Sequence, residues 1–143
     1  MGELYDTDIM EWSKQQARLL RGMASGEAIP TKPDWLRLAD EVEGVGRAEL
    51  FAVRSLLRRA LTHMLRAEAW PLSHKVDEWQ AEARRFRMDA ADRFAPSMRQ
   101  HLSIDRLYRQ ARHAMPQSYD GTAPLLLPTT CPVTLDELLS DEG

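Results

Sequence analysis

The sequence predicts an all-α fold, a single helical domain over residues 1–143. Three observations support this fold class. Apolar residues recur at helical spacing through most of the first 115 positions, capping residues and helix breakers stand where these patterns begin and end, and no segment alternates with the period of two that a strand requires. We also find no turn dipeptide that predicts a hairpin. A chain of 143 residues can bury a core of its own without disulfides.

The first predicted helix follows Asp6-Thr7-Asp8, where a side-chain oxygen can accept a hydrogen bond from a backbone N–H of the first turn. It ends near Ser25-Gly26, because glycine is favoured just after the end of a helix. Residues 26–33 contain two prolines and predict a connector. The apolar stripe of this helix comprises Ile9, Met10, Trp12, Ala17, Leu19, Leu20 and Met23.

The second predicted helix is long and runs from a cap at Asp34 to about Trp70-Pro71. At 100° per residue its apolar positions fall on one broad face, which predicts a central helix packed against two or more other segments. These positions are Trp35, Leu38, Val42, Val45, Val53, Leu56, Leu57, Ala60 and Met64, widened on one side by Leu36, Leu50, Leu61 and Leu65. Gly46 falls on the same face, so we expect another helix to cross closely there. Gly44 falls on the polar side and predicts a kink.

Two shorter helices are predicted next, one from a cap at Ser73 to about Phe94 and one from about Ser103 to Met115. Together with the first two they make about four main helices. The inward positions of the third helix are Val76, Trp79, Ala83, Phe86, Ala90 and Phe94, and those of the fourth are Ile104, Leu107, Tyr108 and Ala111.

The last part of the chain predicts an extended arm and a short helix. Residues 116–133 hold four prolines and no helical period, and the arm must pack on the body if Leu125-Leu126-Leu127 are to be buried. Thr134 and Glu137 form a capping-box pattern, which predicts a C-terminal helix over Leu135–Leu139.

Charge is unevenly distributed along the chain. Residues 1–53 carry 6 Lys/Arg against 10 Asp/Glu, residues 54–113 carry 13 against 7, and residues 114–143 carry none against 5. The basic middle segment is a candidate surface for nucleic acid. The alternative is that the acidic ends fold back and neutralise it.

We expect a cytoplasmic protein with no membrane segment. The N-terminus is acidic and lacks the pattern of a secretory signal, and no apolar run approaches the roughly 20 residues of a membrane-spanning helix. Cys131 is the single cysteine, so an internal disulfide is impossible.

The candidate site residues lie on the long helix and are Glu41, Glu43, Arg47, Arg54 and His63. Glu43, Arg47 and Arg54 follow the boundary between its apolar and polar faces, and His63 lies at the edge of the apolar face. Arg37 and Glu41 are four residues apart, as are Glu43 and Arg47, so each pair can form an ion pair along the helix. If another helix covers Glu43, Arg47 and Arg54, they form a partly buried charge network; if water reaches them, they contribute little. His63 either hydrogen-bonds a carbonyl or an acid, or takes part in metal or acid–base chemistry.

Other chemistry has little support in the sequence, and we predict no metal and no cofactor. The chain contains no Glu-x-x-His pair, and its four histidines lie on different elements. Cys131 is expected to pack as a small apolar residue. The arginines of residues 81–93 spread around the helix, which is typical of a salt-bridged surface, and the four tryptophans are interpreted mainly as core.

Several runs resemble one bacterial family. LADEVEGVGRAE, RSLLRRALTHMLR, DEWQAEARRF and the ending CPVTLDELL are similar to the family catalogued as domain of unknown function 29, over nearly the whole chain. Gly44 and Val45 replace an acid and a leucine that are more common there, and Met64 follows His63 where the family has leucine. The resemblance implies a small all-helical protein and no activity.

The function therefore stays open among three classes. The leading hypothesis is a non-enzymatic helical module that binds a protein partner, with its own copy among the candidates. The alternatives are nucleic-acid binding through residues 54–113 and an uncharacterised enzyme with a polar site beside the long helix.

Overall fold

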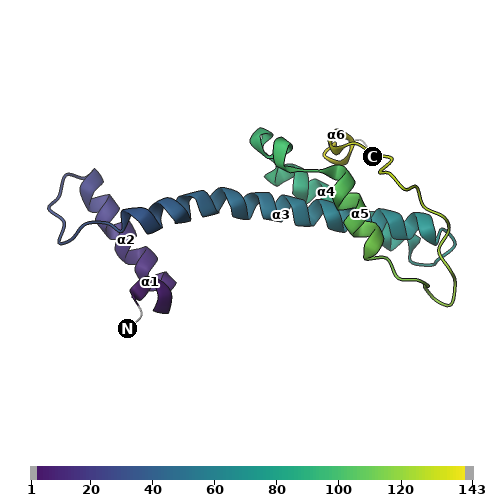
Figure 1. Ribbon diagram of the computed structural model, residues 1–143, viewed down its shortest axis with the longest axis horizontal. Helices are drawn as coiled ribbons and strands as arrows, with labels where there is room; N and C mark the ends of the chain where they lie inside the picture. The colour runs from purple at the N-terminus through teal and green to yellow at the C-terminus, as the bar shows by residue number, and fades with distance from the viewer. Residues whose placement is uncertain (1–2, 141–143) are drawn as a thin grey trace. The chain divides into compact units, whose positions relative to one another are not determined.

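The computed structural model describes residues 3–140 and is helical (Figure 1). Its elements are α1 (Leu4–Thr7), α2 (Ile9–Ala24), α3 (Trp35–Ala69), α4 (Val76–Arg93), a 3₁₀ turn (Pro96–His101), α5 (Ile104–His113) and α6 (Leu135–Leu138). Over these residues the only β feature is an isolated bridge between Tyr119 and Thr122. The all-α prediction with a long central helix is confirmed.

The chain forms two compact units, Met1–Gly46 and Arg47–Gly143. Helix α3 contributes its first turns to the first unit and the remainder to the second. The boundary directly follows Gly46, the second of the two glycines in the helix. Whether residues 1–143 act as one domain stays a prediction.

In the first unit, α2 is bounded by the predicted signals. The side chain of Asp8 accepts a hydrogen bond from the backbone N–H of Glu11 at 3.1 Å, and Gly26 adopts a positive φ of 73° just beyond the helix end. Trp12 and Leu19 are buried. Both ends of the first predicted helix are therefore correct.

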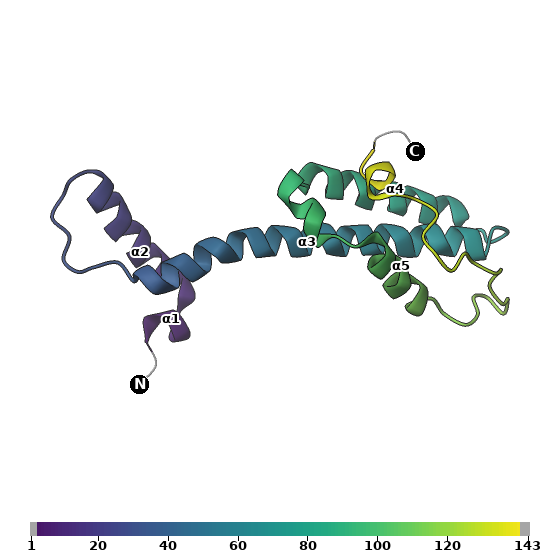
Figure 2. The same ribbon diagram turned by 45° about the horizontal axis from the view of Figure 1, so that its top comes forward.

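In the second unit, the C-terminal half of α3 is the centre of the core, and Figure 2 shows α4 and α5 beside it. The buried residues of this cluster are Val53, Leu57, Leu61, Leu65, Ala90, Leu107, Tyr108, Ala111 and Leu138. They come from α3, α4, α5 and α6. A second buried cluster joins Ala67, Ala69 and Trp70 at the end of α3 to Trp79 of α4.

The start of the third helix was predicted too early. Helix α4 begins at Val76, and its N-cap, Lys75, makes no side-chain capping bond. Ser73 instead accepts a hydrogen bond from the backbone N–H of Lys75 at 3.1 Å, so it stabilises the turn before the helix. The same side-chain chemistry serves either a cap or a turn.

The extended arm packs on the second unit through specific hydrogen bonds. The hydroxyl of Tyr108 donates to the carbonyl of Pro128 at 2.6 Å, and the indole N–H of Trp70 donates to the carbonyl of Thr122 at 2.9 Å. Leu127 is half-buried, but Leu126 is fully exposed. The predicted arm is present, and the expectation that it buries all three leucines is wrong.

A tight turn in the arm escaped the sequence analysis. Asp120 and Gly121 have φ values of 51° and 75°, and the backbone groups of Tyr119 and Thr122 bond each other across them. An Asp-Gly pair with positive φ at both positions is the signature of a type I′ turn. The turn places the Tyr119 ring against Trp70 and Trp79, with centroids 5.7 and 5.0 Å away.

The C-terminal helix is capped at both ends. The hydroxyl of Thr134 accepts from the N–H of Glu137 at 3.1 Å, as predicted, although α6 ends at Leu138, one residue early. Arg87 of α4 donates to the carbonyls of Glu137 and Leu138 at 2.8 and 3.1 Å. A cation at a helix C-terminus also interacts favourably with the helix dipole, so Arg87 fixes α6 to α4.

Candidate functional site

The apolar face of α3 is buried in the second unit and exposed in the first. Val53 has no exposed surface, whereas Trp35, Val42 and Val45 are 51%, 71% and 67% exposed. The prediction that this whole face packs inside the protein is therefore wrong for the first turns of α3. Trp35 is also the tryptophan that does not belong to the core, since the other three are almost fully buried.

The exposed residues form a regular pattern that we call the seam, comprising Trp35, half-buried Leu38, Val42 and Val45. Successive members are separated by three, four and three positions. This is the a/d spacing with which one helix packs along another in a coiled coil. The seam is thus an apolar stripe of the kind that accepts a helix.

Gly46 lies beside the seam in open space. A Cβ placed there would meet no atom within 4 Å, so the close helix crossing predicted at this glycine is absent among the described residues. Ala39, about two turns earlier on the same edge, is also exposed. One edge of the seam therefore carries small residues and no obstruction.

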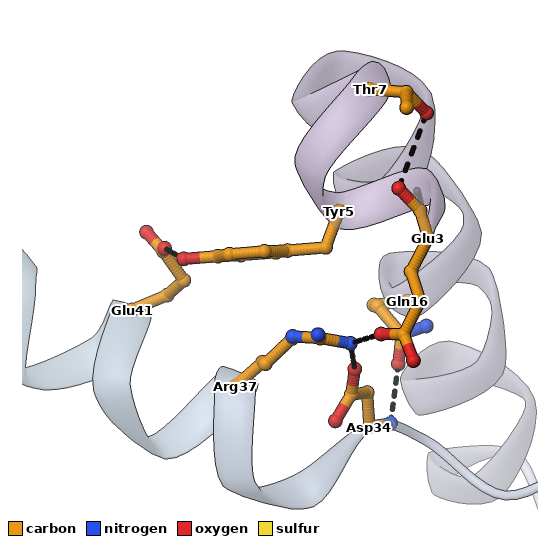
Figure 3. Close-up of polar contacts among 7 residues, drawn as sticks. All are labelled: Glu3, Tyr5, Thr7, Gln16, Asp34, Arg37 and Glu41. Atoms are coloured by element: carbon orange, nitrogen blue, oxygen red, sulfur yellow. Dashed lines mark hydrogen bonds and ion pairs between the residues drawn. The ribbon is translucent and has the colours of Figure 1, made fainter. Parts of the chain in front are cut away.

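Polar contacts attach α1 to α3 through residues beside the seam (Figure 3). The hydroxyl of Tyr5 donates to Glu41 at 2.5 Å, and this hydrogen bond raises the pKa of Tyr5. Arg37 pairs with Glu3 and, at 3.0 Å, with Asp34. Arg37 was predicted to pair with Glu41, but the structure gives both residues other partners.

Helix α2 is also attached to the start of α3 by a polar bond. Gln16, a buried polar residue of α2, accepts a hydrogen bond from the backbone N–H of Asp34 at 2.7 Å. At 100° per residue Glu41 is displaced by about a quarter turn from the middle of the seam and Arg37 by about a third of a turn. The contacts that hold the first unit together therefore leave its apolar stripe on α3 uncovered.

The five candidate residues are divided between the two units. Glu41 and Glu43 belong to the first, and Arg47, Arg54 and His63 belong to the second. Glu43 and Arg47 are exposed, and each has an interaction partner. Whether any of the five serves a function stays a prediction.

Within the second unit, Arg54 and His63 have separate surroundings. Arg54 donates to the carbonyl of His101 at 3.2 Å, while Nδ1 of His63 lies 2.9 Å from the carbonyl of Arg59. Nine residues separate Arg54 from His63, which is two and a half turns, so they point to opposite sides of α3. The His63 ring is half-buried and packs on Phe86. Its bond to a carbonyl is the first of the two alternatives that the sequence left open for this residue.

Part of the basic charge of the second unit is paired with acidic side chains. Arg85 bonds Glu82 at 2.5 Å, Arg93 lies 3.6 Å from Glu49, and Arg99 bonds Asp136 at 2.8 Å. Asp136 belongs to the acidic C-terminal segment, so one ion pair joins that segment to the basic middle.

The described residues contain no group of three or more His, Cys, Asp and Glu side chains arranged to hold a metal ion. The thiol of Cys131 donates to the carbonyl of Val133 at 3.2 Å, and burial raises its pKa. A raised pKa keeps the sulfur protonated and weakly nucleophilic. No helix in the described part of the chain is long and apolar enough to cross a membrane.

Comparison with known proteins decides the family. The model of the family described as "Domain of unknown function DUF29" matches residues 4–142. The chain belongs to the DUF29 family. A solved structure similar to this DUF29 chain is an alpha-helical protein of unknown function from Rhodospirillum rubrum, with a TM-score of 0.67 and 25% sequence identity, covering 99% of this chain and 92% of the other. No curated protein gives a significant match.

The seam and the contacts of Tyr5 are the features of this DUF29 chain that the sequence analysis missed. The 3-4-3 spacing of the seam was visible in the sequence and was interpreted as core. The residues that could have distinguished a binding stripe from a core stripe are Ala39 and Gly46, which are small and uncharged and lie along its edge. For Tyr5 no pattern in the sequence predicted a bond to a residue 36 positions away.

Proposed function

We propose that this DUF29 chain is a non-enzymatic protein–protein interaction module whose first unit binds its partner through the seam. The observation that supports this is the exposure of Trp35, Val42 and Val45 on a helix face whose later residues, including Val53 and Leu57, are buried. Apolar side chains exposed in a contiguous regular pattern are characteristic of binding surfaces.

The seam supplies part of the free energy that a specific interaction needs. Burying a large apolar side chain completely contributes about 1.5–3 kcal/mol. Because between half and three quarters of Trp35, Val42 and Val45 is exposed, covering them supplies roughly 4 kcal/mol before the entropic cost of association. A partner that also contacts the neighbouring surface of the first unit would add to this.

Site-specific photo-crosslinking in the native host tests the proposal. A photoreactive residue at position 42 should give a discrete crosslinked product of defined mass. The same residue at Lys14, which is exposed on α2, is the matched control and should give none. If position 42 gives no product, or the same products as position 14, the seam is not a binding surface.

We also propose that the module acts in the bacterial cytoplasm. The solved relative comes from a bacterium, and the half-buried Cys131 is a free thiol, as is usual in a reducing compartment. Fractionation of cells that produce the tagged chain should recover it with cytosolic markers, and recovery with periplasmic markers would contradict this placement.

A further inference from the structure

The geometry of the seam favours a helix as its occupant. A stripe at positions a and d is narrow, and its 3-4 spacing matches the side chains of one facing helix. The exposed Ala39 and Gly46 occupy e positions of the same heptads, where the absence of bulk permits a close approach of the two backbones. The small edge and the apolar stripe thus specify the same kind of partner.

The charge of the first unit favours a basic partner. Residues 1–46 contain 5 Lys/Arg against 9 Asp/Glu, a formal charge of −4. Asp34 and Glu41 occupy g positions directly beside the seam. Asp34 is paired with Arg37, but Glu41 accepts its bond from the neutral hydroxyl of Tyr5, which does not cancel the carboxylate charge.

We propose that the partner presents a basic amphipathic helix, with apolar residues against the seam and Lys or Arg toward Glu41. This inference rests on the proposed function and adds the chemistry of the partner. A second copy of the chain is disfavoured as the partner, because pairing two seams would bring together two units that each carry a formal charge of −4.

Two synthetic peptides test the inference with the full chain. Both have about three heptads with leucine at a and d. One carries lysine and arginine at its flanking positions, and the other carries glutamate. Trp35 is the reporter, because Trp12, Trp70 and Trp79 are already buried and contribute a constant signal.

We expect the basic peptide to shift the fluorescence to shorter wavelength with a Kd at least about tenfold below that of the acidic peptide at low salt. The preference should shrink as salt is added, because the charges are exposed. Trp35→Phe should abolish the fluorescence change, and Val42→Ser should weaken binding of the basic peptide.

A matched pair of charge variants tests whether Glu41 itself contributes to binding of the basic peptide. Glu41→Gln keeps an acceptor for the Tyr5 hydroxyl and removes one charge beside the seam, so it should weaken binding of the basic peptide severalfold. Glu27→Gln removes one charge in the connector after α2 and should change binding little. Equal effects of the two variants would show that only the net charge of the unit matters, and the proposed contact with Glu41 would be wrong.

Three results would overturn the proposed partner. They are equal binding of the two peptides, a dimer of the chain that the basic peptide does not dissociate, and protection of Trp35 from acrylamide quenching in the free monomer. If the basic peptide fails while crosslinking at position 42 succeeds, the inferred charge of the partner is wrong and the proposed function stands. If both fail, both are wrong.

Discussion

Replacing equivalent valines along α3 tests whether the seam is exposed. Val53, Val42 and Val45 occupy the same helix face, but Val53 is fully buried and the other two are largely exposed. Val53→Ala should therefore destabilise the protein, while Val42→Ala and Val45→Ala should have almost no effect. The three substitutions are chemically identical, so differences among them report burial alone.

The expected magnitudes follow from burial. Val→Ala removes about two buried methylene equivalents at about 0.8 kcal/mol each, and the cavity left at Val53 raises the loss to about 2–3 kcal/mol. At Val42 and Val45 only about a third of the side chain is covered, so the loss falls to about 0.5 kcal/mol. Alanine's higher helix propensity returns a similar amount, and the net change is close to zero.

Denaturant unfolding followed by circular dichroism measures these changes. Leu19→Ala is the control for the first unit, since Leu19 is buried there and its loss should cost about 2–5 kcal/mol. If Leu19→Ala is detected and Val42→Ala or Val45→Ala costs as much as Val53→Ala, the seam is covered in the free protein. That result would refute the proposal that the seam is a binding surface.

Further predictions concern the other contacts of the fold. Tyr108→Phe removes the hydrogen bond to the Pro128 carbonyl and should lower the free energy of unfolding by about 0.5–1.5 kcal/mol, with faster proteolysis of the arm as the second measurement. Cys131 should react with iodoacetamide at pH 8 more slowly in the native chain than in denaturant, because burial raises its thiol pKa; equal rates would contradict this. Tyr5 has a folded-state pKa raised above 10.0, so its bond to Glu41 stabilises the protein below the ordinary tyrosine pKa and is lost as the pH rises through the raised value. Wild type should accordingly unfold at higher denaturant concentration than Tyr5→Phe at neutral pH, and a gap that persists well above pH 10 would show that the hydroxyl proton is not responsible.

Helix positions were predictable because their signals are local. Asp8, Ser103 and Thr134 each cap the helix that follows, through a hydrogen bond from the N–H three residues on. Because glycine and proline lie near the helix ends, the predicted boundaries were correct to within a few residues. Ser73 shows the limit of such signals, since its hydroxyl stabilises a turn instead.

Burial was less predictable because it depends on segments distant in sequence. On a helical wheel Val42 and Val53 are equivalent, so the apolar stripe by itself does not distinguish the covered part of the helix from the open part. The difference arises because α4, α5 and α6 supply partners for the second half of the helix. The same reason explains why the contact between Tyr5 and Glu41, 36 residues apart, was not predicted.

The first unit has little internal stabilisation of its own. The residues it buries are few, namely Trp12, Gln16, Leu19 and Pro33 among those described, and polar bonds at exposed positions hold α1 to α3. Exposed polar contacts contribute little to stability, so this unit belongs to the part of the protein that opens most easily.

A ligand that binds only the folded unit stabilises it by about 2.7 kcal/mol at a concentration one hundred times its Kd. A partner that binds the seam should therefore stabilise the first unit, whereas the second unit has its own buried core around Leu57 and Leu61 and should not be stabilised by contacts on Val42 and Val45.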